Sequence, residues 1–401
     1  MKSVRSVLSI VVVGLAWALP SAAQYQALGS VTTHSQGLVR TETTLQEGAN
    51  PLDRFKLIHL RRQGPPHAPR ATLLFLPPLG TNFSLYEQPD PHGPVGSSIA
   101  GFFALRGFDV YGYSPRMEGL PAGTCETGVL DCSVLAGWNL ASVVRDVTYI
   151  RGLIEAESPG ARVFLGGVSL GSISAMATVD EHPADYAGVI LWEGMLYSDD
   201  PVVVALNGPY CAQLEAQLAA GITADGVGGG VLKQTSYLAS TQPDQLTPIP
   251  LFPPFLTNHQ ALVASLSVET PGPVTLPVPG YVLVNGDPAQ DRFFFASEPR
   301  LYTNVASFNN YSPVALVRDV SCSLAGLETS YVDNLGAFTG PVLAIGGGHG
   351  FGAYMQPNLD LFGSSDVTLL LEPDFGHIDH FMTADHRDYV ERPILRWLTR
   401  H

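Results

Sequence analysis

The chain has 401 residues, enough for one large domain or two ordinary ones, and 45% of them are hydrophobic, so it can bury a sizeable core. Charged residues make up only 14%, a proportion that argues against disorder. The formal net charge is −15 and the only lysines are Lys2, Lys56 and Lys233, so we expect no nucleic-acid partner.

The first residues have the pattern of a secretory signal peptide. Lys2 and Arg5 supply positive charge, a largely apolar run covers residues 7–19, and small residues follow. We expect residues 1–23 to be removed and the mature chain to begin near Gln24. A membrane anchor is the alternative, but a span needs about 20 apolar residues. We therefore expect no stable membrane span after cleavage.

Short apolar or alternating runs predict the strands of a sheet. In chain order they are Leu38–Leu45, Phe55–Leu60, Ala71–Leu76, Phe108–Tyr113, Arg162–Gly166, Val189–Trp192, Val342–Ile345 and Val367–Leu371. Segments of helical character lie between or after them, at Ile99–Arg106, Leu135–Glu155, Leu170–Asp180 and Ala384–His401. Apolar strands that alternate with helices predict an α/β fold, with a mainly parallel sheet covered by helices on both faces.

One long region interrupts this alternation. Residues 196–330 show no strand–helix rhythm and contain clustered prolines, as in residues 247–255. We predict that they form a cap inserted into an α/β core, whose two parts are residues 24–195 and 331–401. A separate, sequential domain is the alternative, but the strand pattern that resumes after the region needs earlier strands to pair with.

Four cysteines are present, and an even number in an exported chain favours disulfides. Cys125 and Cys132 are close enough in sequence to close a small loop, which leaves Cys211 and Cys322 to pair across a long one. Four free buried thiols are the alternative. The sequence has no C-x-x-C motif or Cys/His cluster, so we expect no metal site.

A candidate nucleophile lies in the sequence G-V-S-L-G, which spans Gly167 to Gly171. Ser169 follows a predicted strand and precedes a predicted helix, as the G-x-S-x-G turn requires. The turn is so sharp that a Cβ atom on either glycine would clash with neighbouring backbone. The N–H of Leu170, at the start of the helix, would supply half of an oxyanion hole. A purely structural tight turn is the alternative.

A serine nucleophile needs a base, and position selects His377 among eleven histidines. It lies in P-D-F-G-H-I-D-H-F, after the strand 367–371 and before the last predicted helix. Side chains that follow parallel strands gather at one edge of the sheet, so Ser169 and His377 can meet there. His380, expected on the helix, and His349, in a loop after another strand, are the rivals.

With these motifs the sequence resembles the α/β-hydrolase family over most of the mature chain apart from the cap. The resemblance implies the chain order nucleophile, acid, histidine. The strand sequence L-L-F-L-P-P-L-G matches the place where the family often has a His-Gly pair followed by a second oxyanion donor, here Leu79. Pro77 and Pro78 depart from that pattern and lack an N–H, so the donor would come from Leu79 or Gly80.

The family usually places its acid after the strand 342–345, but the first carboxylate there is the distant Asp360. Glu193 ends the preceding strand. Some family members, the haloalkane dehalogenases among them, carry their acid after this strand in a similar M-E segment. We therefore expect Glu193 to orient His377, with Asp360 as the alternative. Asp379 is so close to His377 that we expect it to cap the last helix.

Those dehalogenases use an aspartate nucleophile, whereas a serine with a histidine base suits acyl transfer. We therefore predict a secreted or periplasmic serine hydrolase of the esterase or lipase type, acting on a small-molecule or lipid ester and using no cofactor or metal. A peptidase or an acyltransferase with the same triad is an alternative. A non-catalytic binding protein would be favoured if Ser169, His377 and a carboxylate fail to converge.

Overall fold

The computed structural model describes residues 25–64, 69–89, 98–125, 127–128, 130–225, 227–267, 278–284 and 292–401. The expected signal peptide, residues 1–23, lies outside the described residues. No helix in the described part of the chain is both long and apolar enough to cross a membrane.

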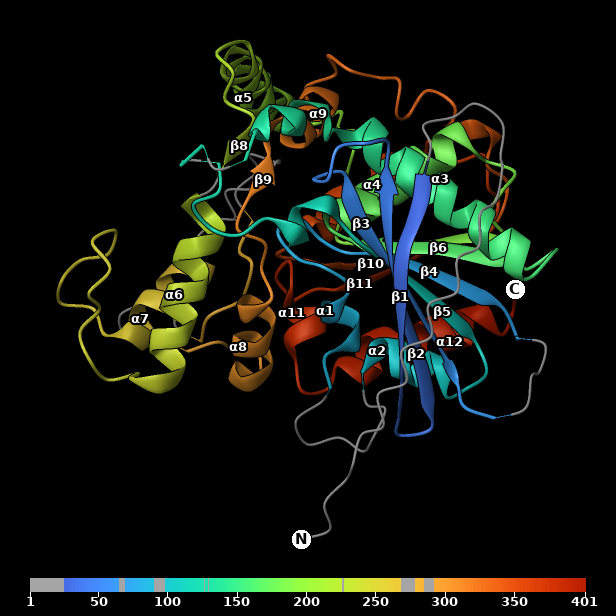
Figure 1. Cartoon of the computed structure of the whole chain (residues 1–401), viewed down its shortest axis with the longest axis horizontal. Helices are drawn as coiled ribbons and strands as arrows, with labels where there is room; N and C mark the ends of the chain where they lie inside the picture. Colours follow the sequence, from blue (N-terminus) through green and yellow to red (C-terminus); the bar gives the residue numbers. More distant parts are fainter. Residues whose placement is uncertain are drawn as a thin grey trace, which may run out of the picture.

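A nine-stranded sheet forms the centre of the molecule (Figure 1). Its strands are β1 (Tyr25–Ser35), β2 (Leu38–Glu47), β3 (Arg54–Arg62), β4 (Thr72–Leu76), β5 (Asp109–Ser114), β6 (Val163–Val168), β7 (Gly188–Trp192), β10 (Val342–Gly347) and β11 (Val367–Glu372). Their order across the sheet is β1-β2-β3-β5-β4-β6-β7-β10-β11. Neighbours from β5 to β11 pair in parallel, whereas β1, β2, β3 and β5 pair antiparallel. The predicted mainly parallel sheet is therefore confirmed.

All eight predicted strands are present, with ends that differ by a few residues. Strand β1, which pairs only with β2 at the edge of the sheet, was not predicted. Most of its residues are exposed on both faces, so it has no apolar alternation to reveal it.

Two hydrophobic layers cover the two faces of the sheet, because successive strand residues point to opposite sides. Leu74 and Leu165 belong to one layer, with helices α3 (Leu140–Glu157) and α4 (Leu170–Glu181). Their strand neighbours Leu73 and Phe164 belong to the other layer, with α2 (Ile99–Ala104) and α12 (Arg392–Leu398). The apolar character of the central strands follows from this double burial.

Two predicted helices have different bounds. The segment 135–155 begins as a 3₁₀ turn (Cys132–Gly137), and α3 starts only at Leu140, because the side chain of Asn139 accepts the N–H of Ser142 and caps the helix there. The segment 384–401 is a π-helical turn (Arg387–Glu391) followed by α12. Pro393 lies in the first turn of α12 and has no N–H to continue the α-helical ladder from the preceding turn.

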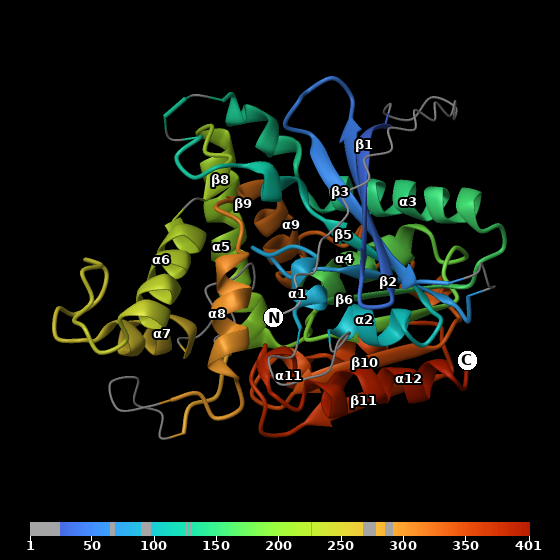
Figure 2. The same ribbon diagram turned by 60° about the horizontal axis from the view of Figure 1, so that its bottom comes forward.

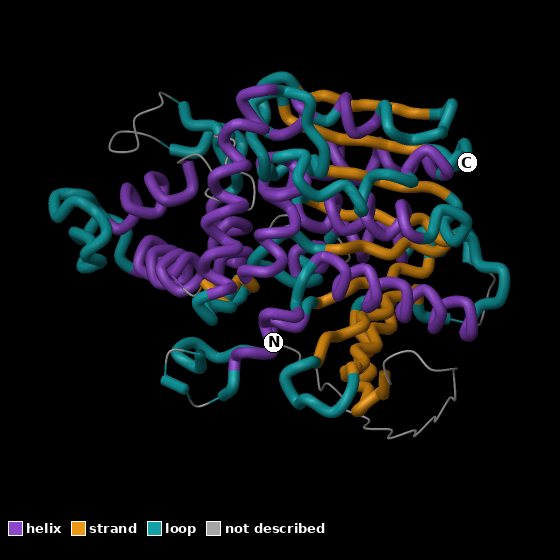
Figure 3. Tube along the Cα trace, turned by 90° about the horizontal axis from the view of Figure 1, so that it is seen from above, coloured by secondary structure: helices purple, strands orange, loops and turns teal. Residues whose placement is uncertain are grey.

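Between β7 and β10 none of the residues that the structure describes forms a strand of the main sheet, although these two strands are neighbours in it. The intervening elements are α5 (Pro201–Ala219), β8 (Ala224–Asp225), α6 (Val227–Thr241), α7 (Asn258–Ser267), α8 (Glu298–Ala306), β9 (Ser312–Pro313) and α9 (Val314–Leu324). Helices α5 to α8 gather on one side of the sheet, away from the C-terminus (Figures 2 and 3).

Both expected disulfides are present. Cys125 pairs with Cys132, and Cys211 pairs with Cys322, which joins α5 to α9. The second disulfide closes a loop with a sequence separation of 111 residues, so it ties together the two ends of the region between β7 and β10.

Candidate active site

Ser169 lies in the tight turn between β6 and α4. Its backbone has φ 56° and ψ −120°, a conformation that residues other than glycine rarely adopt. Such strain costs roughly 1 to 3 kcal/mol and persists where the surrounding structure enforces it. Here the N–H of Ser169 donates to the carbonyl of Trp192 at 2.8 Å, which ties the turn to the end of the neighbouring strand β7.

The two glycines of the motif are required by close backbone approach, as predicted. A Cβ atom on Gly167 would overlap the backbone of Gly171. A Cβ atom on Gly171 would overlap the carbonyl of Leu76 at the end of β4. The turn therefore packs directly against the loop that follows β4.

His377 lies in the loop between β11 and the short helix α11 (Asp379–Met382), and its side chain is buried. Its Nε2 is 3.0 Å from Ser169 Oγ, although the two residues are 208 apart in sequence. The ring of Phe351 stands edge-on to the imidazole, with centroids 4.6 Å apart. The structure therefore brings the expected base to the expected nucleophile.

Glu193 lies directly after β7 and is fully buried. Its Oε2 is 3.0 Å from His377 Nδ1 and also accepts the N–H of Phe351 at 2.7 Å. The other oxygen, Oε1, accepts the N–H of Gly347. Backbone donors from the end of β10 and from the loop that follows it thus stabilise the buried carboxylate and hold it beside the imidazole.

Glu193 also has a positive φ, 50°. Only Gln36, Ser169 and Glu193 share this feature among the non-glycine residues that the structure describes. Two of these three strained positions are thus in the Ser169–His377–Glu193 cluster. Strained backbone of this kind concentrates at functional sites.

The rival residues lie elsewhere. Asp360, the alternative acid, is exposed at the end of helix α10 (Gln356–Leu359), where its carboxylate accepts the side-chain N–H of Gln356. His349 lies in the loop after β10, and its backbone N–H donates a hydrogen bond to the carbonyl of Phe375. His380 is on α11, a short helix that precedes the last predicted helix on which it was expected, and it is fully buried against the ring of Phe375.

Asp379 does not cap the last helix, so that expectation is wrong. It is the first residue of α11, and its Oδ2 accepts the N–H of Gly376 at 2.8 Å and that of Val282 at 3.1 Å. These donors come from the histidine loop and from a distant segment of the chain. The carboxylate accepts their N–H groups instead of an N–H group in the first turn of a helix. Burial, together with the nearby charge of Glu193, raises the pKa of Asp379 to about 7.

The expected oxyanion donors lie on two loops that touch. Leu170 is the first residue of α4. Leu79 is partly buried and follows the Leu76–Pro77 carbonyls that face Gly171. Among the hydrogen bonds formed between described residues, none takes the N–H of Leu170 or of Leu79. Both amides therefore remain available to an acceptor.

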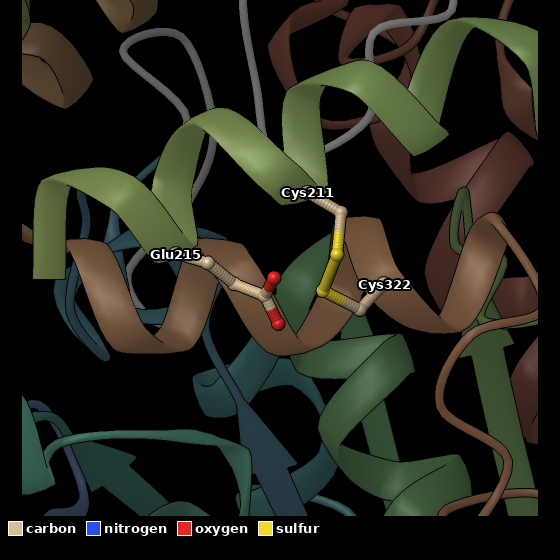
Figure 4. Close-up of side chains that lie close together, drawn as sticks. All are labelled: Cys211, Glu215 and Cys322. Atoms are coloured by element: carbon tan, nitrogen blue, oxygen red, sulfur yellow. A yellow bond between two sulfur atoms is a disulfide. The ribbon is translucent and has the colours of Figure 1, made fainter. Parts of the chain in front are cut away.

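One other group of side chains has the composition of a metal site. The ligand atoms of Cys211, Glu215 and Cys322 lie within 4.8 Å of one another, the only such group in the described part of the chain (Figure 4). The two sulfur atoms are bonded to each other, so neither offers the thiolate that zinc binds. This group is a disulfide with a neighbouring carboxylate.

Two parts of the site were not predicted from the sequence. The first is the pair of amides, Gly347 and Phe351, that hold Glu193, although the glycine-rich stretch G-G-G-H-G-F-G signals close backbone approach there. The second is the segment 278–282, which contacts the histidine loop. No motif or periodicity in that segment signals such a contact.

No protein-family model matches the chain, and no curated protein matches its sequence. Solved structures do match. One is a Sulfolobus solfataricus protein assigned as a lipase, with a TM-score of 0.66, 18% identity, and coverage of 93% of this chain and 99% of that one. Another is a thermostable carboxyl esterase from Bacillus coagulans, with a TM-score of 0.52, 16% identity, and coverage of 94% and 99%.

Proposed function

Because the chain has the α/β-hydrolase fold, we propose that the cluster at the edge of its sheet is the active site of a secreted serine hydrolase that cleaves carboxylic esters. The observation that carries the proposal is the continuous contact from Ser169 Oγ through His377 to Glu193, with 3.0 Å at each step. A serine oriented in this way by a histidine and a buried carboxylate is equipped for acyl transfer.

In the first half of the reaction, Ser169 Oγ attacks the ester carbonyl carbon. His377 Nε2 takes the hydroxyl proton as the Oγ–carbon bond forms. The tetrahedral intermediate then collapses, the carbon–alkoxy bond breaks, and His377 returns the proton to the leaving alcohol. An acyl group remains bound to Ser169.

In the second half, a water molecule replaces the alcohol. His377 takes a proton from the water as its oxygen attacks the acyl carbon, and the proton then returns to Ser169 Oγ as the acid leaves. Glu193 keeps the proton of His377 on Nδ1, so that Nε2 can accept, and its negative charge stabilises the imidazolium that forms twice per cycle.

The negative charge that develops on the carbonyl oxygen needs donors. The N–H of Leu170 lies at the start of α4, where the helix dipole also favours an anion. We assign the second donor to Leu79. The contact between Gly171 and the loop after β4 supports this assignment, because it brings the two loops together.

Residues 196–330 are proposed to form a cap on a core made of residues 24–195 and 331–401. The adjacency of β7 and β10 supports this division, because the intervening helices are then an insertion. The region has exposed apolar side chains on several elements, including Leu206, Tyr237 and Phe255. An apolar acyl or alcohol group is therefore the expected substrate feature, and the ester is a small molecule or a lipid.

Export is proposed from the signal-peptide pattern and is supported by the two disulfides, which persist in oxidising compartments. Expression of the full chain with its own N-terminus, followed by N-terminal sequencing of the exported product, tests this proposal. A mature N-terminus near Gln24 is expected. Retention of the chain in the cell with Lys2 and Arg5 intact would contradict it.

The catalytic proposal is tested with a fluorophosphonate probe, which reacts with activated serines. We expect one adduct, located on Ser169 by mass spectrometry and absent from Ser169→Ala. A panel of p-nitrophenyl esters of increasing chain length then gives the acyl preference, and matched amides test for peptidase activity. A folded, oxidised protein that neither reacts with the probe nor cleaves any ester would overturn the proposal.

A further inference from the structure

The loop that carries His377 is held by a segment about 100 residues earlier in the chain. The N–H of His377 donates to the carbonyl of Pro279 at 3.0 Å, and the N–H of Ile378 donates to that of Gly280 at 2.9 Å. In the return direction, the N–H of Val282 donates to the carboxylate of Asp379 at 3.1 Å. Residues 279–282 thus lie against the histidine loop and are joined to it by three hydrogen bonds.

The approach of the two backbones is close. A Cβ atom on Gly376 would lie 2.8 Å from the carbonyl oxygen of Pro279 and 3.1 Å from Asp379 Oδ2. Asp379 itself is fully buried, and the same oxygen that accepts from Val282 also accepts the N–H of Gly376. One carboxylate oxygen therefore connects the residue before His377 to the distant segment.

A second set of contacts extends this attachment along α11. The N–H of Ser297 donates to the carbonyl of Met382 at 2.7 Å, and the guanidinium of Arg300 in α8 donates to the carbonyl of Phe381 at 2.9 Å. Helix α8 accordingly lies beside α11 (Figures 1 and 2). The region between β7 and β10 is thus joined to the histidine loop at both ends of α11.

From these contacts we propose that Asp379 is a positioning residue of the hydrolase site: its carboxylate fastens the histidine loop to residues 279–282 and thereby holds His377 in line with Ser169 and Glu193. The inference rests on the proposed function for the meaning of that alignment. It assigns the inserted region a part in building the catalytic geometry, beyond covering it. Misplacement of a catalytic group by about 1 Å can cost roughly 100-fold in rate.

The test compares Asp379→Ala, Asp379→Asn and Asp374→Ala. Alanine removes the acceptor, whereas asparagine keeps one oxygen for both N–H groups. Asp374 is exposed and lies three residues before His377, so Asp374→Ala is the matched control for loss of a nearby charge. Each variant is titrated with the fluorophosphonate so that kcat is expressed per active site, and KM is measured on the best p-nitrophenyl ester.

We expect Asp379→Ala to lower kcat per active site by roughly 10- to 100-fold with KM little changed, because binding does not depend on the position of His377. Asp379→Asn should recover most of this loss, and Asp374→Ala should match the wild type. A purely structural role would reduce the number of active sites but leave kcat per site unchanged, which would overturn the proposal. If Asp379→Ala does not fold, Asp379→Asn decides, because a tenfold loss there would show that the charge, not the bridge, matters.

A readout that needs no substrate separates this proposal from the proposed function. The Nδ1 proton of His377, shared with Glu193, is expected as a low-field proton NMR resonance that disappears in Glu193→Ala. Loss or displacement of this resonance in Asp379→Ala, but not in Asp374→Ala, supports positioning even in a protein without esterase activity. An unchanged resonance in a folded Asp379→Ala protein would overturn the positioning role while leaving the catalytic proposal intact.

Discussion

Glu193 Oε2 lies 3.0 Å from His377 Nδ1, a contact between residues 184 apart in sequence. The carboxylate is buried, and its remaining hydrogen bonds come from the backbone of Gly347 and Phe351. Among the described residues, its hydrogen-bond partners are His377, Gly347 at the end of β10 and Phe351 in the loop that follows. The ends of β7 and β10 therefore position Glu193 together against His377.

Replacement of Glu193 by Gln should reduce kcat by about 10³- to 10⁴-fold, because an amide cannot stabilise the imidazolium and allows the wrong tautomer of His377. Steady-state hydrolysis of a p-nitrophenyl ester measures the effect. Asp360→Asn is the matched control. We expect its kcat to equal that of the wild type, since Asp360 is exposed and its carboxylate accepts a hydrogen bond from the side chain of Gln356. A comparable loss in Asp360→Asn would instead identify Asp360 as the acid.

Gly350→Ala should impair catalysis through Glu193. Gly350 has φ −93°, which alanine adopts without strain, but its Cβ atom would overlap Glu193 Oε2. The carboxylate must then move away from His377, so we expect kcat to fall at least tenfold, by the same sensitivity to position as above.

Gly152→Ala provides the control for the glycine substitution. Gly152 lies in α3, and its Cβ atom would meet nothing within 4 Å. This variant should keep the wild-type kcat and gain up to about 1 kcal/mol of stability from its higher helix propensity. Equal kcat values for the two alanine variants would show that Glu193 is not held where the structure places it.

The parts of the fold that could be predicted are those that leave a signature in a few consecutive residues. The central strands are apolar because both faces of the sheet are covered, and the turn at Ser169 needs glycines because backbone from β4 and α4 meets there. The first requirement gives short runs of apolar residues and the second gives the G-x-S-x-G motif, so both can be recognised in a few consecutive residues. The convergence of Ser169 and His377 could be anticipated as well, because parallel strands end at the same edge.

The parts that could not be predicted depend on contacts between distant segments without a repeating pattern. Strand β1 is exposed on both faces and shows no alternation. The Asp379 carboxylate could have capped a helix as well as accepted the N–H of Val282, which is 97 residues earlier. Only the three-dimensional arrangement decides between these two partners, since the side-chain chemistry suits both.

The two disulfides should contribute unequally to stability. In the chain-entropy account, the Cys211–Cys322 bridge, with its separation of 111, contributes about 5 kcal/mol and the Cys125–Cys132 bridge, with its separation of 7, about 2 kcal/mol. Urea unfolding of the two double alanine variants measures both values. The larger loss is expected in Cys211→Ala/Cys322→Ala. The reverse order would indicate that packing around Cys125 and Cys132 outweighs loop closure.

His380 should make the protein sensitive to acid. Both ring nitrogens are buried without a hydrogen-bond partner among the described residues, and burial, with the nearby His377, lowers the pKa of His380 from 6.5 to about 3. The unfolded chain therefore binds a proton between pH 6.5 and 3 that the folded protein does not. By linkage, the free energy of unfolding falls as the pH is lowered from 6.5 towards 3. At pH 4.5 the loss due to His380, relative to its contribution above pH 6.5, is about 2 to 3 kcal/mol.

Asp379 acts in the opposite direction. Its pKa is raised from 3.8 to about 7, so the folded protein retains a proton that the unfolded chain releases, and stability falls as the pH rises through that window. In the wild type, the pH dependence of the free energy of unfolding due to Asp379 therefore opposes that due to His380. Removal of His380 should therefore expose the slope due to Asp379, and the protein should become relatively more stable in mild acid.

His380→Leu and His380→Asn test this, because neither residue takes up a proton in the window. Urea unfolding of the wild type and both variants at pH 7.5 and pH 4.5 gives four differences in the free energy of unfolding. We expect each variant to gain about 2 to 3 kcal/mol relative to the wild type on going from pH 7.5 to 4.5, whatever its absolute cost at pH 7.5. If the free energy of unfolding changes between the two pH values by the same amount in the variants as in the wild type, His380 is protonated in the folded protein at pH 4.5, and a partner compensates its burial.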